Sequence, residues 1–106
     1  MSGLGDMGNL LKQAQEMQRQ MDKVKSELRT RGISGSSASG DVRIELSADR
    51  QEVRSVHVSE DLLRSSAAEV SERIQGALSD ALRRAQDVEK EEIGRVTGGM
   101  QLPGFF

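Results

Sequence analysis

The first part of the chain carries a regular apolar repeat. From Met7 to Leu28 the apolar residues are separated by steps that alternate between three and four. This heptad spacing is typical of a helix that buries one seam, so we expect a long helix here, with Asp6 or Asn9 as its cap and Gly32 at its end. The seam consists of Met7, Leu10, Ala14, Met17, Met21, Val24 and Leu28.

The middle of the chain turns to glycine and serine and then to alternating residues. Residues 32–40, GISGSSASG, favour a flexible crossing or a poor edge strand. Residues 41–47, DVRIELS, alternate as a half-buried strand does, and after a turn at 48–51 a second strand is predicted over 52–59, EVRSVHVS. Val53 has the wrong parity for that strand, which indicates a bulge or a late start. The two strands predict a hairpin.

Two serines introduce the last regular part. Ser59 before EDLL and Ser66 before a capping Glu69 fit helix N-caps, so we expect a short helical turn followed by a long helix. After Val88 the apolar pattern thins, which predicts that this helix projects past the body of the fold until Gly98 stops it. Its apolar face consists of Val70, Ile74, Ala77, Leu78, Ala81, Ala85 and Val88. We expect one domain over residues 1–97, then an apolar tail over 98–106.

Composition points to a lean core in a chain without cysteine. Of 106 residues, 35% are hydrophobic and only 2% aromatic, so burial must come from smaller side chains and a partner subunit is favoured to complete the core. The net charge of −2 gives no global attraction to nucleic acid, so any anion binding must be local. The absence of cysteine suits a reducing compartment, and neither a membrane span nor a secretory signal is evident, so we expect a cytoplasmic protein.

No arrangement of residues selects a catalytic or metal site. The single histidine, His57, is flanked by valines in a predicted strand, and a position on the surface or in a dimer seam explains it better than catalysis. One histidine without cysteine excludes the usual zinc sets. The glycine-rich segment lacks the lysine and following helix of a phosphate-binding loop. We therefore expect no enzyme, no metal and no cofactor.

Positive charge collects on the first helix. Residues 1–31 hold six bases against four acids, whereas residues 60–106 hold six bases against nine acids. Lys12, Arg19 and Lys23 avoid the apolar seam and form an outward stripe interrupted by Glu16. Charge alone favours a solvated helix face. The alternative is a phosphate-contacting surface, which would bind the backbone of duplex DNA without base readout, because no aromatic residue is interleaved to stack on bases and no helix-turn-helix is evident.

Two segments resemble a known family. MGNLLKQAQEMQRQMDKVKSEL is similar to the opening helix, and GMQLPGFF to the closing segment, of the YbaB/EbfC family of bacterial nucleoid-associated proteins. The resemblance covers nearly the whole chain. It implies an α+β subunit with a small antiparallel sheet of about three strands, a homodimer joined through the strands with long helices projecting like tweezer arms, and duplex DNA binding with a role in the nucleoid and in gene regulation.

The resemblance also suggests which bases contact DNA. Lys12, Arg19 and Lys23 match the basic positions of the family's first helix. On the second long helix we nominate Arg83, Arg84 and Lys90 as further DNA-binding residues.

Dimerisation also follows from bare strand edges, which could pair across a two-fold axis. The expected sheet face in the core and dimer is Val42, Ile44, Leu46, Val56 and Val58. We expect this face to pack on Ile74, Leu78 and Ala81 of the last helix. Met17, Met21 and Val24 of the first helix are expected to pack against Ala85 and Val88.

The tail leaves a second function class open. Its apolar residues are spaced to dock on a groove of a neighbouring helix or of a partner protein, and the alternative is a frayed end. These residues are Met100, Leu102, Phe105 and Phe106. In the alternative to DNA binding, the basic stripe is merely solvated and the chain is a protein-interaction module or adaptor to replication or repair proteins.

Overall fold

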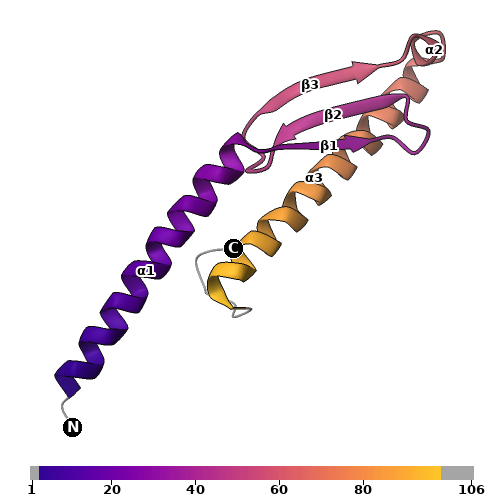
Figure 1. Ribbon diagram of the computed structural model, residues 1–106. Coiled ribbons are helices and arrows are strands. Elements are labelled where there is room, and N and C mark those ends of the chain that lie inside the picture. Colours follow the sequence, from indigo (N-terminus) through magenta and orange to yellow (C-terminus); the bar gives the residue numbers. More distant parts are fainter. Residues whose placement is uncertain (1–2, 99–106) are drawn as a thin grey trace.

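A computed structural model describes residues 3–98, and within them the predicted order of elements is confirmed (Figure 1). The fold is α+β, with a long helix at each end of a three-stranded sheet. The molecule is elongated, with extents of 75 × 20 × 16 Å. The elements are α1 (Gly3–Thr30), β1 (Gly32–Ser36), β2 (Val42–Ser47), β3 (Val53–Val58), α2 (Glu60–Leu63) and α3 (Ala67–Thr97).

The sheet is antiparallel throughout, in the order β1-β2-β3. The glycine-rich segment forms a regular edge strand in its first half, the second of the two alternatives that its sequence allowed. The bulge that Val53 indicated is confirmed. Val53 lies opposite Leu46 and Ser55 lies opposite Glu45, so Arg54 is the extra residue and Val53 shares a face with Val56.

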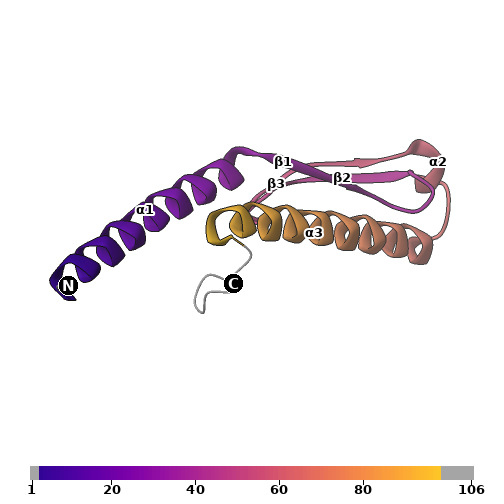
Figure 2. The same cartoon turned by 60° about the horizontal axis from the view of Figure 1, so that its bottom comes forward.

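Helix α3 covers one face of the sheet, whereas no described element covers the other (Figure 2). It packs on β1 and β2, and its contacts with β3 are few. Small side chains at the contact allow α3 to lie close to β1. A Cβ at Gly35 of β1 would lie 2.5 Å from Ala81 Cα, so the helix backbone approaches β1 as closely as glycine allows. Ala77, Ala81 and Ala85 are fully buried beneath this contact.

Two apolar clusters form the core. The first joins the sheet to α3 and contains the buried Val42, Ile44, Leu46, Leu62, Ala77 and Ala81, with Val58, Val70 and Ile74 packed at its margin. The second joins the ends of the long helices and contains Met21, Val24, Leu28, Ile33, Ala48, Ala85 and Ile93, with Val88 and Val96 at its margin. The expected packing of Met21 and Val24 against Ala85 and Val88 is therefore confirmed, whereas Met17 is only half-buried.

The expected packing of Val56 and Leu78 in a shared core was wrong for the single protomer. Val56 is 55% exposed and Leu78 is 37% exposed, although both lie on apolar faces. The reason is lateral: α3 lies over β1 and β2 and makes few contacts with β3, where Val58 rather than Val56 packs at the margin of the core. Val56 keeps the predicted facing, opposite Ile44 in the register, but does not belong to either apolar cluster.

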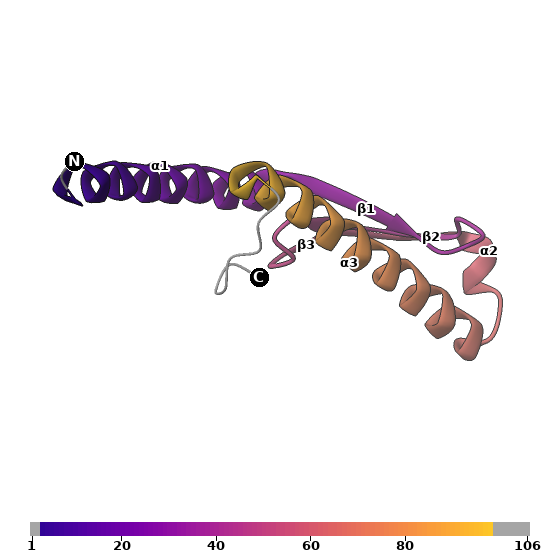
Figure 3. The same ribbon diagram turned by 90° about the horizontal axis from the view of Figure 1, so that it is seen from below.

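The prediction that the last helix projects was also wrong. Beyond Val88, α3 packs against the second half of α1, where Ile93 and Thr97 are buried. The projecting element is instead the N-terminal part of α1, which extends well past the end of α3 (Figure 3).

The predicted starts of α2 and α3 are confirmed by their caps, whereas the expected cap of the first helix at Asp6 or Asn9 is wrong, because α1 already begins at Gly3. The hydroxyls of Ser59 and Ser66 accept hydrogen bonds from the backbone N–H groups of Leu62 and Glu69. Gly98 ends α3 with φ +65°, a left-handed conformation that glycine adopts without strain. No helix within residues 3–98 is long and apolar enough to cross a membrane.

Candidate nucleic-acid interface

The basic stripe lies on the projecting helix and faces away from the core. Because each residue turns a helix by about 100°, Lys12, Arg19 and Lys23 fall within about 40° of one another. By the same geometry the stripe is centred opposite the apolar seam that α3 covers at Met21 and Val24. The stripe is exposed and about 17 Å long, from eleven residues at about 1.5 Å each.

The stripe keeps an excess of positive charge. Arg19 Nη1 lies 3.0 Å from Glu16 Oε2, one turn away, in an exposed pair that contributes little to stability. Between residues 3 and 98, neither Lys12 nor Lys23 forms an ion pair. Three cations and one carboxylate therefore share this surface, and Arg19 can exchange Glu16 for a phosphate at small cost.

The nominated arginines of α3 share one carboxylate. Asp80 lies 2.6 Å from Arg83 Nη2 and 3.0 Å from Arg84 Nε. It also accepts a hydrogen bond of 3.0 Å from the backbone N–H of Ser36 in β1. That backbone bond and the two guanidinium groups hold the pKa of Asp80 below its ordinary value of 3.8. Asp80 therefore ties α3 to the sheet edge, and Arg83 and Arg84 are partly neutralised.

The two helices do not present their bases on one surface. Arg83 and Lys90 are seven residues apart and share a face of α3, whereas Arg84 points about 100° away from Arg83. Ala85 and Ile93, which pack toward α1, point on average about 110° away from Arg83 and Lys90 around α3. Since the α1 stripe also faces outward, one protomer has two separate basic patches, and the α1 stripe is the one on a projecting helix.

The acidic run at residues 89–92 is neutralised by arginines. Arg50, in the turn between β2 and β3, donates to both carboxylate oxygens of Glu89 at 3.2 Å. Arg95 pairs with Glu91 and Glu92 at 3.0 and 2.9 Å. These acids thus fasten α3 to the hairpin turn and to its own last turn, so they leave less negative charge on this part of α3 than the sequence indicates.

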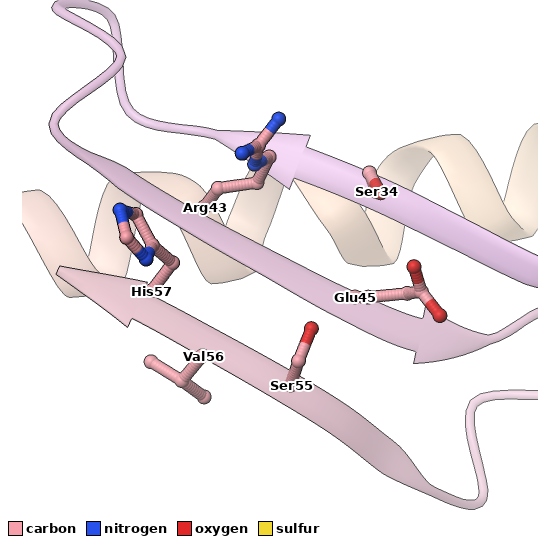
Figure 4. Close-up of a pocket in the computed structure, with 6 residues that line it drawn as sticks. All are labelled: Ser34, Arg43, Glu45, Ser55, Val56 and His57. Carbon is pink, nitrogen blue, oxygen red and sulfur yellow. The ribbon is translucent and has the colours of Figure 1, made fainter.

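The uncovered sheet face carries a polar groove of about 400 Å³ that sequence reasoning did not single out (Figure 4). It is lined by Ser34, Arg43, Glu45, Ser55, Val56 and His57. His57 is exposed and lies beside Arg43 in the strand register. The alternation of Arg43 and Glu45 on the polar side of β2 could have indicated this face. Because Glu45 offsets Arg43, the groove is a weaker attractor of phosphate than the α1 stripe.

Among the described residues, no group of three or more histidine, aspartate and glutamate side chains is placed to hold a metal ion. The tail residues Met100, Leu102, Phe105 and Phe106 lie outside the described residues. Of the predicted 98–106 tail, the structure describes Gly98 alone.

Comparison with known proteins agrees with this geometry. The crystal structure of HP0035, an uncharacterized protein from Helicobacter pylori, is similar with a TM-score of 0.70 at 17% sequence identity. The match covers 92% of this chain and 99% of that chain, and it shows the shared fold. Residues 3–100, nearly the whole sequence, match the YbaB/EbfC DNA-binding family. The chain with this projecting basic helix therefore belongs to the YbaB/EbfC DNA-binding family.

Proposed function

We propose that this protein binds duplex DNA as a homodimer, through phosphate contacts made by Lys12, Arg19 and Lys23. In this proposal it is a cytoplasmic, nucleoid-associated protein that organises the nucleoid and influences gene expression. The observation that carries the proposal is an outward basic stripe on a projecting helix, in a chain of a DNA-binding family. The function is one of binding, and it uses no catalytic group, metal or cofactor.

The stripe suits backbone contact better than base readout. Its length of about 17 Å matches about five base pairs at about 3.4 Å each. Lysine and arginine on an exposed helix reach phosphate oxygens, which fix position without reading sequence. The only aromatic residues of the chain are Phe105 and Phe106, so the stripe has no side chains that stack on bases. Binding is therefore expected to be sequence-tolerant and salt-dependent.

Dimerisation is supported by an apolar patch beside an open strand edge. Val53 and Val56 of β3 are more than half exposed, and Leu82 of α3 is 41% exposed near the partly exposed Leu78. Asp80 points to β1, so the opposite flank of α3, with Leu78 and Leu82, is directed toward β3. A second copy that adds its β3 to this edge would cover the patch and satisfy the edge backbone groups. It would also double the number of basic stripes.

Charge reversal tests the DNA contact. We expect Arg19→Glu with Lys23→Glu to abolish binding to a random-sequence labelled duplex, measured by fluorescence anisotropy at several salt concentrations. Lys25→Glu with Arg64→Glu is the matched control, because it makes the same change in net charge at exposed positions off the stripe. Equal losses in both variants would mean that only net charge matters. Undiminished binding in the stripe variant would instead favour the protein-interaction module.

A charge on the apolar patch tests the dimer. Val56→Lys is expected to shift the protein from dimer to monomer in sedimentation velocity, because a lysine would meet apolar side chains across the interface. Ser55→Lys is the control, since Ser55 belongs to the same strand but faces the other side of the sheet (Figure 4). A Val56→Lys protein that remains dimeric would place the interface elsewhere.

A further inference from the structure

The apolar seam of α1 is covered along only half of its length. Met21, Val24 and Leu28 are buried against α3. Toward the N-terminus the same seam continues, but Met7 is 59% exposed and Leu10 is 63% exposed. Leu11 is also exposed and widens this uncovered half, which with Ala14 and the half-buried Met17 we call the open seam. An apolar stripe this wide normally faces a packing partner.

The end of α3 brings the chain to this surface. Helix α3 runs antiparallel to α1, and its last turn lies beside the second half of α1 while α1 continues beyond it (Figures 1 and 3). Val96 packs in the same cluster as Met21, so α3 ends near the point where the open seam begins. Gly98 then releases the chain from the helix in a left-handed conformation.

The sequence that follows has the length and composition to cover the open seam. Eight residues, 99–106, remain after Gly98, and they include both aromatic residues of the chain. Extended, they span at most about 28 Å, whereas Met21 to Met7 covers about 21 Å along the helix. Half of them are apolar, in the order Met100, Leu102, Phe105 and Phe106.

A buried hydroxyl in the last turn of α3 is a second observation that points to residues 99–106 as the segment that covers the open seam. Among the residues that the structure describes, the buried hydroxyl of Thr97 in the last turn of α3 has no hydrogen-bond partner. Such a group is costly unless a polar atom approaches it. The segment that follows Gly98 carries backbone N–H and C=O groups, which are the polar partners nearest in sequence that this hydroxyl could take.

We propose that residues 99–106 dock on the open seam of α1 in the same protomer, with Phe105 and Phe106 against Leu10 and Met7. The docked segment stabilises a helix half that is exposed within the described part of the chain and would fray by itself. It leaves Lys12, Arg19 and Lys23 free, because the stripe lies on the opposite face. By keeping this half of α1 helical, the docked segment should also support DNA affinity; that effect rests on the proposed function, whereas the docking does not.

Engineered cysteines test the contact directly, since the chain has none of its own. In the full chain, Leu10→Cys with Phe105→Cys is expected to form an intrachain disulfide under mild oxidation, detected by intact mass and non-reducing gels. Gln15→Cys with Phe105→Cys is the control, because Gln15 faces about 130° away from the middle of the seam. Equal rates for the two pairs would overturn the docking, and so would a disulfide formed only between chains.

Hydrogen exchange tests the consequence for α1. Phe105→Ser with Phe106→Ser is expected to speed amide exchange over residues 7–17 by about tenfold or more, because burying one large apolar side chain is worth more than a tenfold change in equilibrium. Gln101→Ala is the matched control. Unchanged exchange in the phenylalanine variant would contradict the proposal. Faster exchange with unchanged DNA affinity would keep the docking and count against the DNA-binding role of α1.

Discussion

Gly35 is the position where one added methyl group should lower the free energy of unfolding most. In Gly35→Ala the new Cβ would meet the backbone N of Ala81 and would lie 2.5 Å from its Cα and 2.6 Å from its Cβ. Ordinary carbon contacts are about 3.5–4.0 Å, so α3 would have to retreat by about 1 Å from β1. Overpacking a core typically costs about 1–3 kcal/mol. Because the obstacle is helix backbone, which cannot rotate away, we expect a loss near 3 kcal/mol.

The assay is thermal unfolding followed by circular dichroism at one fixed protein concentration, because a dimer unfolds at a concentration-dependent temperature. A loss of about 3 kcal/mol lowers the Tm of a domain of this size by about 12 °C or more. The matched control is Gly76→Ala within α3, where a Cβ would have nothing within 4 Å. There alanine should raise the free energy of unfolding by about 0.5–1 kcal/mol, since glycine is the poorer helix former.

The two alanine substitutions must therefore shift stability in opposite directions. If Gly35→Ala unfolds at the wild-type temperature, α3 does not approach β1 as closely as the structure shows. The explanation for the uncovered β3, which rests on that close approach, would then fail as well.

Two further predictions concern a cap and a titrating group. Ser66→Ala should lower the free energy of unfolding by about 1 kcal/mol in urea titrations, because the N–H of Glu69 loses its acceptor, whereas Ser71→Ala within the same helix should not. Asp80 has a lowered pKa in the folded state, so its contribution to stability is fully present above 3.8 and is lost as the pH falls from 3.8 through the lowered pKa. Asp80→Asn should therefore weaken the fall in stability with acid over that window, and an unchanged pH profile would show that Asp80 does not couple α3 to β1.

Local rules predicted the elements well, because neighbouring residues alone decide them. The alternation of Val42, Ile44 and Leu46 identified the buried face of β2, and Ser59 and Ser66 identified the helix starts. The odd parity of Val53 indicated a bulge or a late strand start, and the register shows that it is a bulge. These signals act over a few residues and do not depend on which element packs above them.

The packing of one element across another could not be predicted in the same way. Val56 faces the side that its parity indicates. Whether a helix covers it depends on where α3 lies, and Gly35, which is distant in the sequence, allows α3 to pack closely on β1. The pairing of Asp80 with Arg83 and Arg84 was readable from helical spacing, whereas its bond to Ser36 was not. Similarly, the heptad pattern of α1 is continuous, so nothing in it shows that α3 covers only the second half.

The central claim is that the basic stripe of α1 contacts DNA phosphates, and its most direct test is the salt dependence of DNA binding by a variant whose stripe carries no charge. Affinity for a duplex falls with salt at a slope of about −0.9 per phosphate neutralised. Replacing Lys12, Arg19 and Lys23 with glutamine should therefore weaken binding and reduce the slope by up to about 2.7 per DNA-contacting protomer. A slope equal to that of the unmodified protein would mean that other residues contact the phosphates, and it would contradict the assignment of DNA binding to α1.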